Sequence, residues 1–229
     1  MLIILIWVVT LIFASLSIPY YIRKYRRPDL AIAFYVLYLT LSQLMASKIA
    51  SFNLIFTTFN APAAVLIFPF TFQITDIVNE AFGRFEVHRM IFICFISQVL
   101  MTFFLLLATN LTPAPFWPHQ VSWQNIISLV PRITLASWIA YLVSENLDAY
   151  LYATLKTLTR NRYLWLRNIF SDIPSLGVDS FIFVTLAFWK VMPIWPLIWG
   201  QLVLKWIIGV VDTPLMYLSR RVLYPKIIK

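Results

Sequence analysis

Long apolar stretches recur along this chain and constrain its fold more than any other feature. A helix needs about 20 apolar residues to cross the hydrocarbon core of a bilayer. Stretches of that kind cover residues 2–22, 30–52, a third segment ending near residue 82, and residues 90–111, 132–155, 163–188 and 195–218. The chain is also 61% hydrophobic and only 12% charged, which excludes a soluble cytosolic domain. We therefore predict an all-α polytopic membrane protein.

The segments between these stretches are short. Polar turns are expected around residues 53–60 and 83–89. The segment from Pro113 to Pro131 is rich in proline and tryptophan, so we expect it to lack a regular helix and to lie at the membrane interface. A basic cluster follows the first stretch, whereas a secretory signal peptide carries its positive charge before the apolar run. We therefore expect residues 2–22 to be a transmembrane helix.

Lysine and arginine residues predict the orientation. Loops on the cytoplasmic side of a membrane protein carry an excess of both. Here the loops after the first, third, fifth and seventh stretches hold most of them: Arg23, Lys24, Arg26, Arg27, Arg84, Arg89, Lys156, Arg160, Arg162, Arg220, Arg221, Lys226 and Lys229. We predict a multi-pass protein of the plasma (inner) membrane, with its N-terminus outside and its C-terminus in the cytoplasm.

Several classes of function are excluded by missing residues. Only four glycines occur and none belongs to a phosphate-binding G-x-x-x-x-G-K-[ST] loop, so the chain does not hydrolyse nucleotide itself. The single cysteine, Cys94, excludes an internal disulfide and a cysteine metal cluster. His88 and His119 have no neighbouring residues of metal-ligand type, so we expect no metal and no cofactor. Basic residues are scattered over loops, which argues against nucleic acid as a partner.

Ionisable residues inside the apolar stretches are the best candidates for function. Each costs roughly 2.5–3.5 kcal/mol at the centre of a membrane helix, so such residues are expected to face the bundle interior or a water-filled cavity. The carboxylates are Asp76, Glu80, Glu145, Asp148, Asp172, Asp179 and Asp212. The cations are Lys48, Arg132, Arg167 and Lys205.

Two pairs of these carboxylates share a helix face. Asp76 and Glu80 are four residues apart, and Glu145 and Asp148 are three apart. They either bind substrate donors and carry protons, or form structural ion pairs with nearby cations, for which the sequence offers Arg84, Arg89, Lys156 and Arg167.

The remaining charges suggest other roles. Asp179 and Lys205 lie near the middle of the last two stretches, and a buried, mainly architectural ion pair between them is plausible. Lys48 and Arg132 lie in the outer halves of their stretches. They either bind a substrate that approaches from outside or extend to the interface.

The stretch from Phe68 to Arg84, FPFTFQITDIVNEAFGR, strongly resembles the signature of the YhhQ/VUT family of vitamin uptake transporters, regarded as queuosine precursor transporters. Three further stretches agree in order: Ser47, Lys48 and Ile49; residues 132–137 leading to 144–148; and Arg167 and Asn168, with Ser171 and residues 179–183. Asp172 and Pro174 depart from the family pattern. The resemblance covers about residues 30–217.

This resemblance implies the uptake of 7-cyano-7-deazaguanine or 7-aminomethyl-7-deazaguanine. The family is also similar to the six-helix S components of energy-coupling-factor transporters. We therefore expect an N-terminal transmembrane helix and basic loop at residues 1–29, and a six-helix transporter core at residues 30–229. The sequence leaves open whether the partners include a second copy of the chain or a separate ATPase module.

A deazaguanine is flat and has hydrogen-bond donors along one edge, which a carboxylate can accept in a bidentate manner. Its ring would stack on aromatic side chains. We predict that Glu145 or Asp76 reads this edge, and that Asn168, Gln43 or Gln73 reads the carbonyl and ring nitrogens. Lys48 and Arg132 would shape the outer entrance. Glu80, Asp148, Arg167, Asp179, Lys205 and Asp212 would form a proton-carrying or structural network.

Other functions fit less well. An importer of another vitamin or nucleobase, working with a separate ATPase, is the nearest alternative. An intramembrane enzyme would use Glu145 or Asp148 with Asp179 as an acid pair, but the chain lacks the H-E-x-x-H and G-x-S-x-G motifs. A structural or assembly protein is a further alternative. We expect a transporter and not an enzyme.

Overall fold

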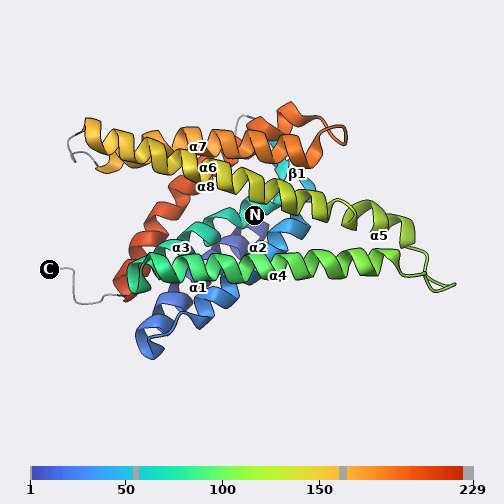
Figure 1. Cartoon of the computed structure of the whole chain (residues 1–229), viewed down its shortest axis with the longest axis horizontal. Coiled ribbons are helices and arrows are strands. Elements are labelled where there is room, and N and C mark those ends of the chain that lie inside the picture. Colours follow the sequence, from blue (N-terminus) through green and yellow to red (C-terminus); the bar gives the residue numbers. More distant parts are fainter. Residues whose placement is uncertain (1, 54–56, 160–163, 224–229) are drawn as a thin grey trace. The chain divides into compact units, whose positions relative to one another are not determined.

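The computed structural model of the protein describes residues 2–53, 57–159 and 164–223. Its elements in chain order are α1 (Leu2–Tyr25), α2 (Asp29–Met45), β1 (Ile49–Asn53), β2 (Thr58–Pro62), the 3-10 helix η1 (Ala63–Leu66), α3 (Phe68–Phe82), α4 (Arg84–Asn110), α5 (Gln120–Ile127), α6 (Val130–Leu158), α7 (Leu164–Phe188) and α8 (Ile194–Leu223) (Figure 1). They divide into two compact units. Unit 1 contains Met1–Met45, Ala64–Ala108 and Ile207–Lys229, and unit 2 contains Ala46–Ala63 and Thr109–Trp206.

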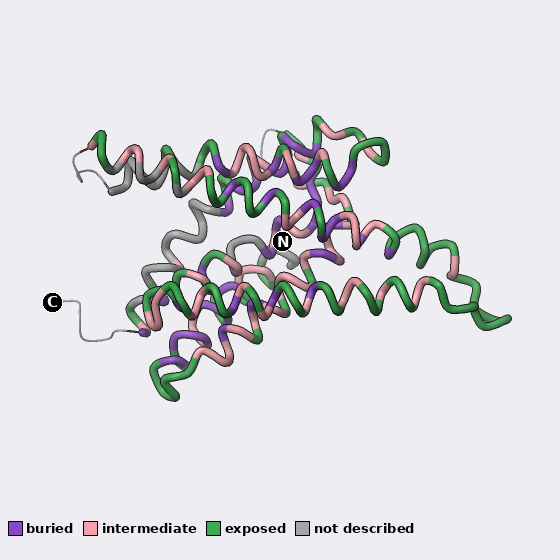
Figure 2. The backbone as a smooth tube through the Cα atoms, in the orientation of Figure 1, coloured by how far each residue is buried: buried purple, intermediate pink, exposed green. Residues whose placement is uncertain are grey.

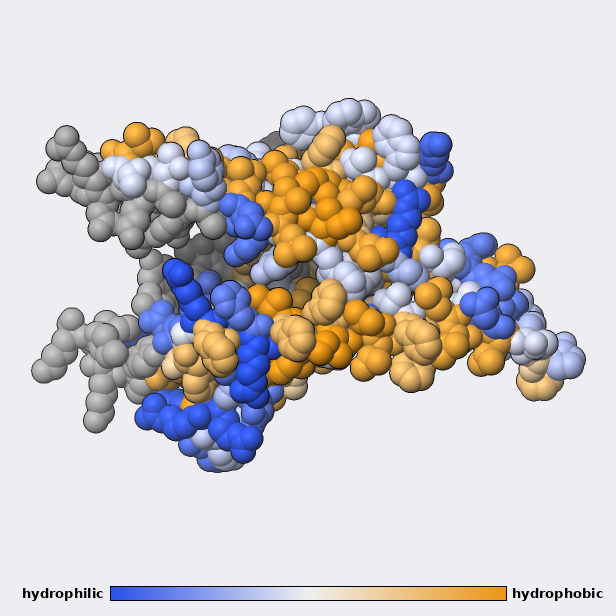
Figure 3. All heavy atoms as spheres, in the orientation of Figure 1, coloured by the Kyte–Doolittle hydropathy of each residue, from blue (hydrophilic) through white to orange (hydrophobic). Residues whose placement is uncertain are grey.

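The helices are those of a membrane protein, as predicted. Within the described ranges, four helical segments are long and apolar enough to span a bilayer: Leu5–Tyr25, Ala63–Phe82, Arg84–Asn110 and Gln120–Asp148. Shorter apolar helical segments cover Asp29–Met45, Ile173–Phe188 and Ile194–Ile208. Large apolar side chains such as Phe92 and Phe104 of α4 are exposed. Figure 3 shows apolar residues along the middle of α4 and hydrophilic residues near its N-terminal end. Such a surface suits contact with lipid.

Unit 1 is built from α1, α2, α3, most of α4 and the C-terminal part of α8. Ile18 of α1, Tyr35 of α2, Val78 of α3 and Cys94 of α4 belong to one buried cluster. Figure 2 shows buried and exposed positions alternating along the helices, as expected where helices pack by a single apolar face. The buried residues of α1 place this helix firmly within unit 1. That the functional core begins at residue 30 stays a prediction.

The join between α3 and α4 is shorter than predicted. Gly83 alone separates the two helices, and its φ of 82° is one that glycine adopts without strain. Its backbone N–H donates to the Asn79 carbonyl at 2.9 Å, which caps α3. The expected loop at residues 83–89 is therefore wrong beyond its first residue. The polar residues after Gly83 form the first turns of α4 instead.

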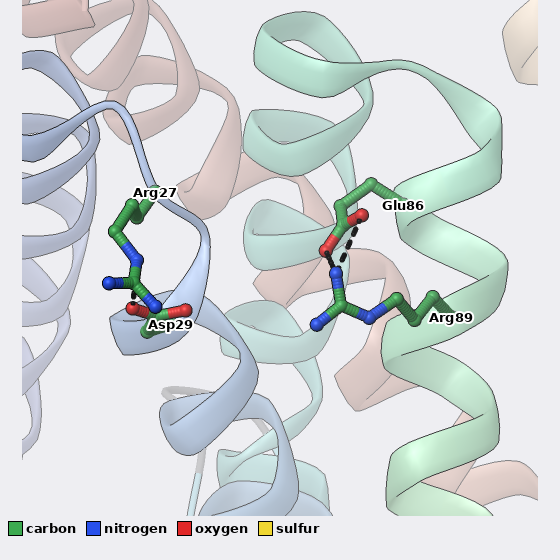
Figure 4. Close-up of polar contacts among 4 residues, drawn as sticks. All are labelled: Arg27, Asp29, Glu86 and Arg89. Carbon is green, nitrogen blue, oxygen red and sulfur yellow. Dashed lines mark hydrogen bonds and ion pairs between the residues drawn. The ribbon is translucent and has the colours of Figure 1, made fainter.

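Acidic side chains occupy the first turns of two helices in unit 1, where their negative charge interacts favourably with the positive end of the helix dipole. Asp29 in α2 pairs with Arg27 at 2.8 Å, and Glu86 in α4 pairs with Arg89 at 2.9 Å (Figure 4). Arg89, which was one predicted partner of the α3 carboxylates, thus pairs with Glu86.

The predicted span at residues 30–52 is wrong at its C-terminal end. Helix α2 ends at Met45, and the strands β1 and β2 form an antiparallel hairpin that pairs Ile49 with Pro62 and Asn53 with Thr58. Polar residues alternate along both strands and bond across them. Ser51 donates to Asn60 at 2.7 Å, and Thr58 donates to Asn53 at 2.9 Å. This alternation with a period of two favours strands over a continued helix.

The segment at residues 113–131 also contains more helix than predicted. Helix α5 covers Gln120–Ile127, and α6 begins at Val130 with a proline in its first turn. The prolines at 113, 115 and 118 precede α5, so the interval up to Pro131 has no proline to interrupt a helix. Pro131 lies where helices tolerate proline best, because the first-turn N–H groups have no partner within the helix.

Candidate functional site

The predicted binding residues of unit 1 differ in how far they are buried. Gln43 of α2 and Gln73 of α3 are buried. The Ser15 hydroxyl of α1 donates to Gln73 Oε1 at 2.5 Å, and the Ser219 hydroxyl of α8 donates to the Ser15 carbonyl oxygen at 2.9 Å. These contacts form a buried polar chain that links three helices of the unit.

Asp76 and Glu80 of α3 were expected to face the bundle interior or a water-filled cavity. Both residues are exposed. The buried face of α3 carries Gln73, Ile74 and Ile77 instead. Asp76 and Glu80 follow Gln73 and Ile77 by three residues each, so they lie at one edge of the buried stripe, where their side chains are exposed. Their roles in binding or proton transfer stay predictions.

The carboxylates of α6 in unit 2 differ from each other. Glu145 is exposed. Asp148 is half-buried, and its Oδ1 accepts a hydrogen bond from the Ser175 hydroxyl of α7 at 3.2 Å. Asp148 therefore helps to join α6 to α7. The predicted edge-reading role of Glu145 is left untested by this geometry.

The predicted ion pair between Asp179 and Lys205 is confirmed. Lys205 Nζ of α8 contacts Asp179 Oδ2 of α7. The Lys205 side chain is 4% exposed and that of Asp179 is 18% exposed. A buried charge costs several kcal/mol unless it is paired, so each side chain needs the other in this position.

Arg132 lies at the start of α6 and caps the C-terminus of α7. Its Nε donates to the Leu186 carbonyl at 2.7 Å, and its Nη2 donates to the Trp189 carbonyl at 2.9 Å. The last carbonyls of a helix have no partner within it, and a cation there also favours the helix dipole. Arg132, Thr185, Leu186 and Trp189 line a shallow, mainly apolar hollow of about 340 Å³. The guanidinium is thus already engaged at the rim of this hollow.

Lys48 is exposed beside the hairpin, and its backbone carbonyl accepts a bond from the Ala63 N–H at 2.8 Å. The side chains of Arg167, Asn168, Asp172 and Asp212 lie outside the described residues. Within the described part of the chain, no group of three His, Cys, Asp or Glu side chains is placed to hold a metal ion.

Among the buried polar side chains of unit 2 that were not predicted as binding residues, two stand out. Ser180 of α7 follows Asp179, and Gln201 of α8 precedes Lys205 by one turn. The Ser180 hydroxyl and the Gln201 Oε1 atom are buried without a hydrogen-bond partner among the described residues. A search for charged residues misses both, because neither side chain is charged. A glutamine one turn from a lysine in an apolar helix would nevertheless have indicated a polar site.

The hairpin packs closely against α8 at Gly200. A Cβ atom at this position would lie 2.0 Å from the backbone carbonyl oxygen of Asn60. Only glycine allows this approach. The contact places the hairpin next to the turn of α8 that carries Gln201.

Comparisons with known proteins agree with the resemblance read from the sequence. The family described as "Putative vitamin uptake transporter" matches residues 62–219. The chain is 28% identical over 156 residues to the "Probable queuosine precursor transporter" of Bacillus subtilis (strain 168), which covers 66% of this chain and 68% of that protein. No solved structure matches significantly.

Two further relatives carry similar names. The "Queuosine precursor transporter" of Escherichia coli (strain K12) is 28% identical over 123 residues, covering 54% of this chain and 53% of that protein. The "Probable queuosine precursor transporter" of Haemophilus influenzae is 25% identical over 133 residues, covering 58% and 54%. The chain thus spans about half the length of these two relatives. All three are transporters by name and not enzymes, as predicted for this chain. Because the family match extends over more than half of its residues, the chain belongs to the vitamin uptake transporter family.

Proposed function

We propose that this protein is a multi-pass membrane transporter that imports a queuosine precursor, a 7-deazapurine such as 7-cyano-7-deazaguanine or 7-aminomethyl-7-deazaguanine. The observation that carries the proposal is the family match over residues 62–219, together with three relatives that are named as transporters of such precursors. Apolar helices of membrane-spanning length and buried polar side chains between them support it.

The proposed architecture is a six-helix core, similar to the S components of energy-coupling-factor transporters, with α1 as an additional helix. The seven long helices α1, α2, α3, α4, α6, α7 and α8 support this arrangement. The direction of the helices supports the proposed orientation of the termini. Helices α1 and α3 end next to basic residues of unit 1, and helices α2 and α4 begin next to them. By the positive-inside rule this end faces the cytoplasm, which puts the N-terminus outside and the C-terminus inside.

Restoration of tRNA modification tests the proposed substrate. A bacterial strain that cannot make the precursor and lacks its own transporter is given 7-cyano-7-deazaguanine at a low external concentration. Expression of this chain is expected to restore queuosine in tRNA, whereas an empty vector is not. Equal queuosine content with and without the chain would refute the proposal. Repeating the assay with 7-aminomethyl-7-deazaguanine separates the two candidate substrates.

A second candidate is an importer of a different vitamin or nucleobase that works with a separate ATPase. The description of the family as vitamin uptake transporters favours it. Binding of a panel of purines and vitamins to the purified chain distinguishes the two, because a ligand that binds only the folded protein raises its melting temperature. Stabilisation by a vitamin, but not by a deazapurine, would favour this second candidate.

A further inference from the structure

Unit 2 contains three buried polar atoms without a hydrogen-bond partner among the described residues. One is the hydroxyl of Thr185, which lines the hollow beside Arg132. The other two, called the orphan atoms here, belong to residues that are themselves buried. The Ser180 hydroxyl belongs to a residue that is 0% exposed, and Gln201 Oε1 to one that is 5% exposed. Neither atom has a hydrogen-bond partner in the described ranges of the chain. Buried polar atoms are nearly always bonded, because leaving one unpaired forfeits the bonds that it makes to water in the unfolded chain. Each of these atoms therefore points to a group that the described residues do not supply.

Both orphan atoms belong to residues within one helical turn of the Asp179–Lys205 ion pair. Ser180 directly follows Asp179 on α7, and Gln201 lies four residues before Lys205 on α8, which puts Gln201 and Lys205 on one face. The buried residues near the ion pair include Ser180 and Val184 on α7, and Gln201 and Leu204 on α8. The ion pair joins the two helices at this level.

The hairpin provides a neighbouring wall. The Asn60 backbone approaches Gly200 so closely that no side chain fits there, and Gln201 is the next residue of α8. Gln201 thus lies between the turn of α8 that contacts the hairpin and the turn that contacts α7. Three elements of unit 2 converge around it.

We infer that Ser180, Gln201 and the Asp179–Lys205 pair form the substrate-recognition site of unit 2, and that its ligand is a neutral heterocycle with an amide-like edge. This inference rests on the proposed function and names the site for it. Gln201 Oε1 accepts a hydrogen bond from a ring N–H, and the Ser180 hydroxyl donates to a ring carbonyl. Apolar neighbours such as Val184 and Leu204 suit the faces of a flat ring.

Charge narrows the choice of ligand. Lys205 neutralises Asp179, so the pair contributes no net charge to the site. A cationic ligand would lose its hydration without gaining an unpaired carboxylate. The site therefore favours the uncharged 7-cyano-7-deazaguanine over the protonated 7-aminomethyl compound.

Binding measurements on the purified full-length chain test this inference. We compare the wild type with Gln201→Met and Ser180→Ala, which keep approximate size and remove one orphan atom each. The matched control is Thr102→Val in α4, because the Thr102 hydroxyl is also buried without a partner among the described residues but belongs to unit 1. The ligand is 7-cyano-7-deazaguanine, and both its Kd and the Tm of the ligand-free protein are recorded.

We expect each unit 2 variant to weaken binding about tenfold, the effect of losing one hydrogen bond to the ligand, with the ligand-free Tm unchanged or raised. Thr102→Val should keep the wild-type Kd. Wild-type affinity in both unit 2 variants, or a lowered ligand-free Tm with unchanged affinity, would show that the orphan atoms serve the fold through buried water and would overturn the inference alone. A wild-type protein that binds no deazapurine would overturn the proposed function as well.

Discussion

Two groups of buried polar side chains, one in each unit, differ in their hydrogen bonding. In unit 1, Ser219, Ser15 and Gln73 bond in a chain across α8, α1 and α3. In unit 2, Ser180 and Gln201 lie beside an ion pair, each with an atom that no described residue satisfies. Satisfied polar groups rigidify a core, whereas unsatisfied ones are costly and are retained where they do something else. The comparison suggests that the polar chain of unit 1 is architectural and that the polar residues of unit 2 contact substrate.

The ion pair gives the largest expected effect. Lys205→Met leaves the Asp179 carboxylate buried without its cation, which should cost about 3–5 kcal/mol of unfolding free energy. The double variant Lys205→Met with Asp179→Leu removes both charges and should recover most of that loss. Denaturation of the purified protein in detergent measures both. A single variant as stable as the wild type would show that this pair does not hold α7 and α8 together.

Gly200→Ala should be next in size. Its methyl group would overlap the Asn60 carbonyl oxygen, so the hairpin or α8 must shift, at about 1–3 kcal/mol. Gly177→Ala in α7 is the matched control, because nothing lies within 4 Å of a Cβ placed there. That change should stabilise the helix by up to about 1 kcal/mol. Thermal unfolding of both variants checks the prediction, and equal melting temperatures would contradict the close contact between α8 and the hairpin.

Breaking the polar chain of unit 1 should have a moderate effect on stability. Gln73→Leu removes the acceptor of the Ser15 hydroxyl and should cost about 1–2 kcal/mol. If the chain is architectural, the double variant with Ser15→Ala recovers part of this loss and the Kd for 7-cyano-7-deazaguanine does not change. A large loss of affinity with full stability would instead support the prediction that Gln73 reads the substrate, and would reverse the comparison between the units.

The exposed carboxylates should have the smallest effect on stability. Asp76→Asn and Glu145→Gln change exposed side chains and should alter the unfolding free energy by less than about 0.5 kcal/mol. Uptake of labelled precursor is the informative measurement. Unchanged uptake by both variants would remove the predicted edge-reading role of these acids, and loss of uptake with full stability would sustain it.

Much of the helical architecture could be predicted from apolar length alone. The segment predicted at residues 163–188 is α7 (Leu164–Phe188), and the one at 195–218 lies within α8 (Ile194–Leu223). The hairpin was missed because its polar alternation covers only a few positions among apolar residues such as Phe52 and Phe59. Averaged hydropathy conceals a period of two over so short a stretch.

Side-chain positions were less predictable. The Asp179–Lys205 ion pair could be predicted, because an isolated charge within an apolar helix is costly and each of these residues needs an opposite charge nearby. Which polar side chain of α3 is buried could not be predicted, because tertiary packing decides it: Gln73 is buried and Asp76 is exposed. Gln201 was missed because a neutral amide is not marked out by charge, and its lack of a partner becomes visible only in the folded chain.

Uptake into proteoliposomes tests the central claim most directly. Vesicles that contain only this purified chain are incubated with labelled 7-cyano-7-deazaguanine, and protein-free vesicles serve as the control. We predict that the label enters the protein-containing vesicles faster and that excess unlabelled compound competes with it. Equal entry into both kinds of vesicle, under conditions in which the purified chain remains folded, would contradict transport by this chain alone.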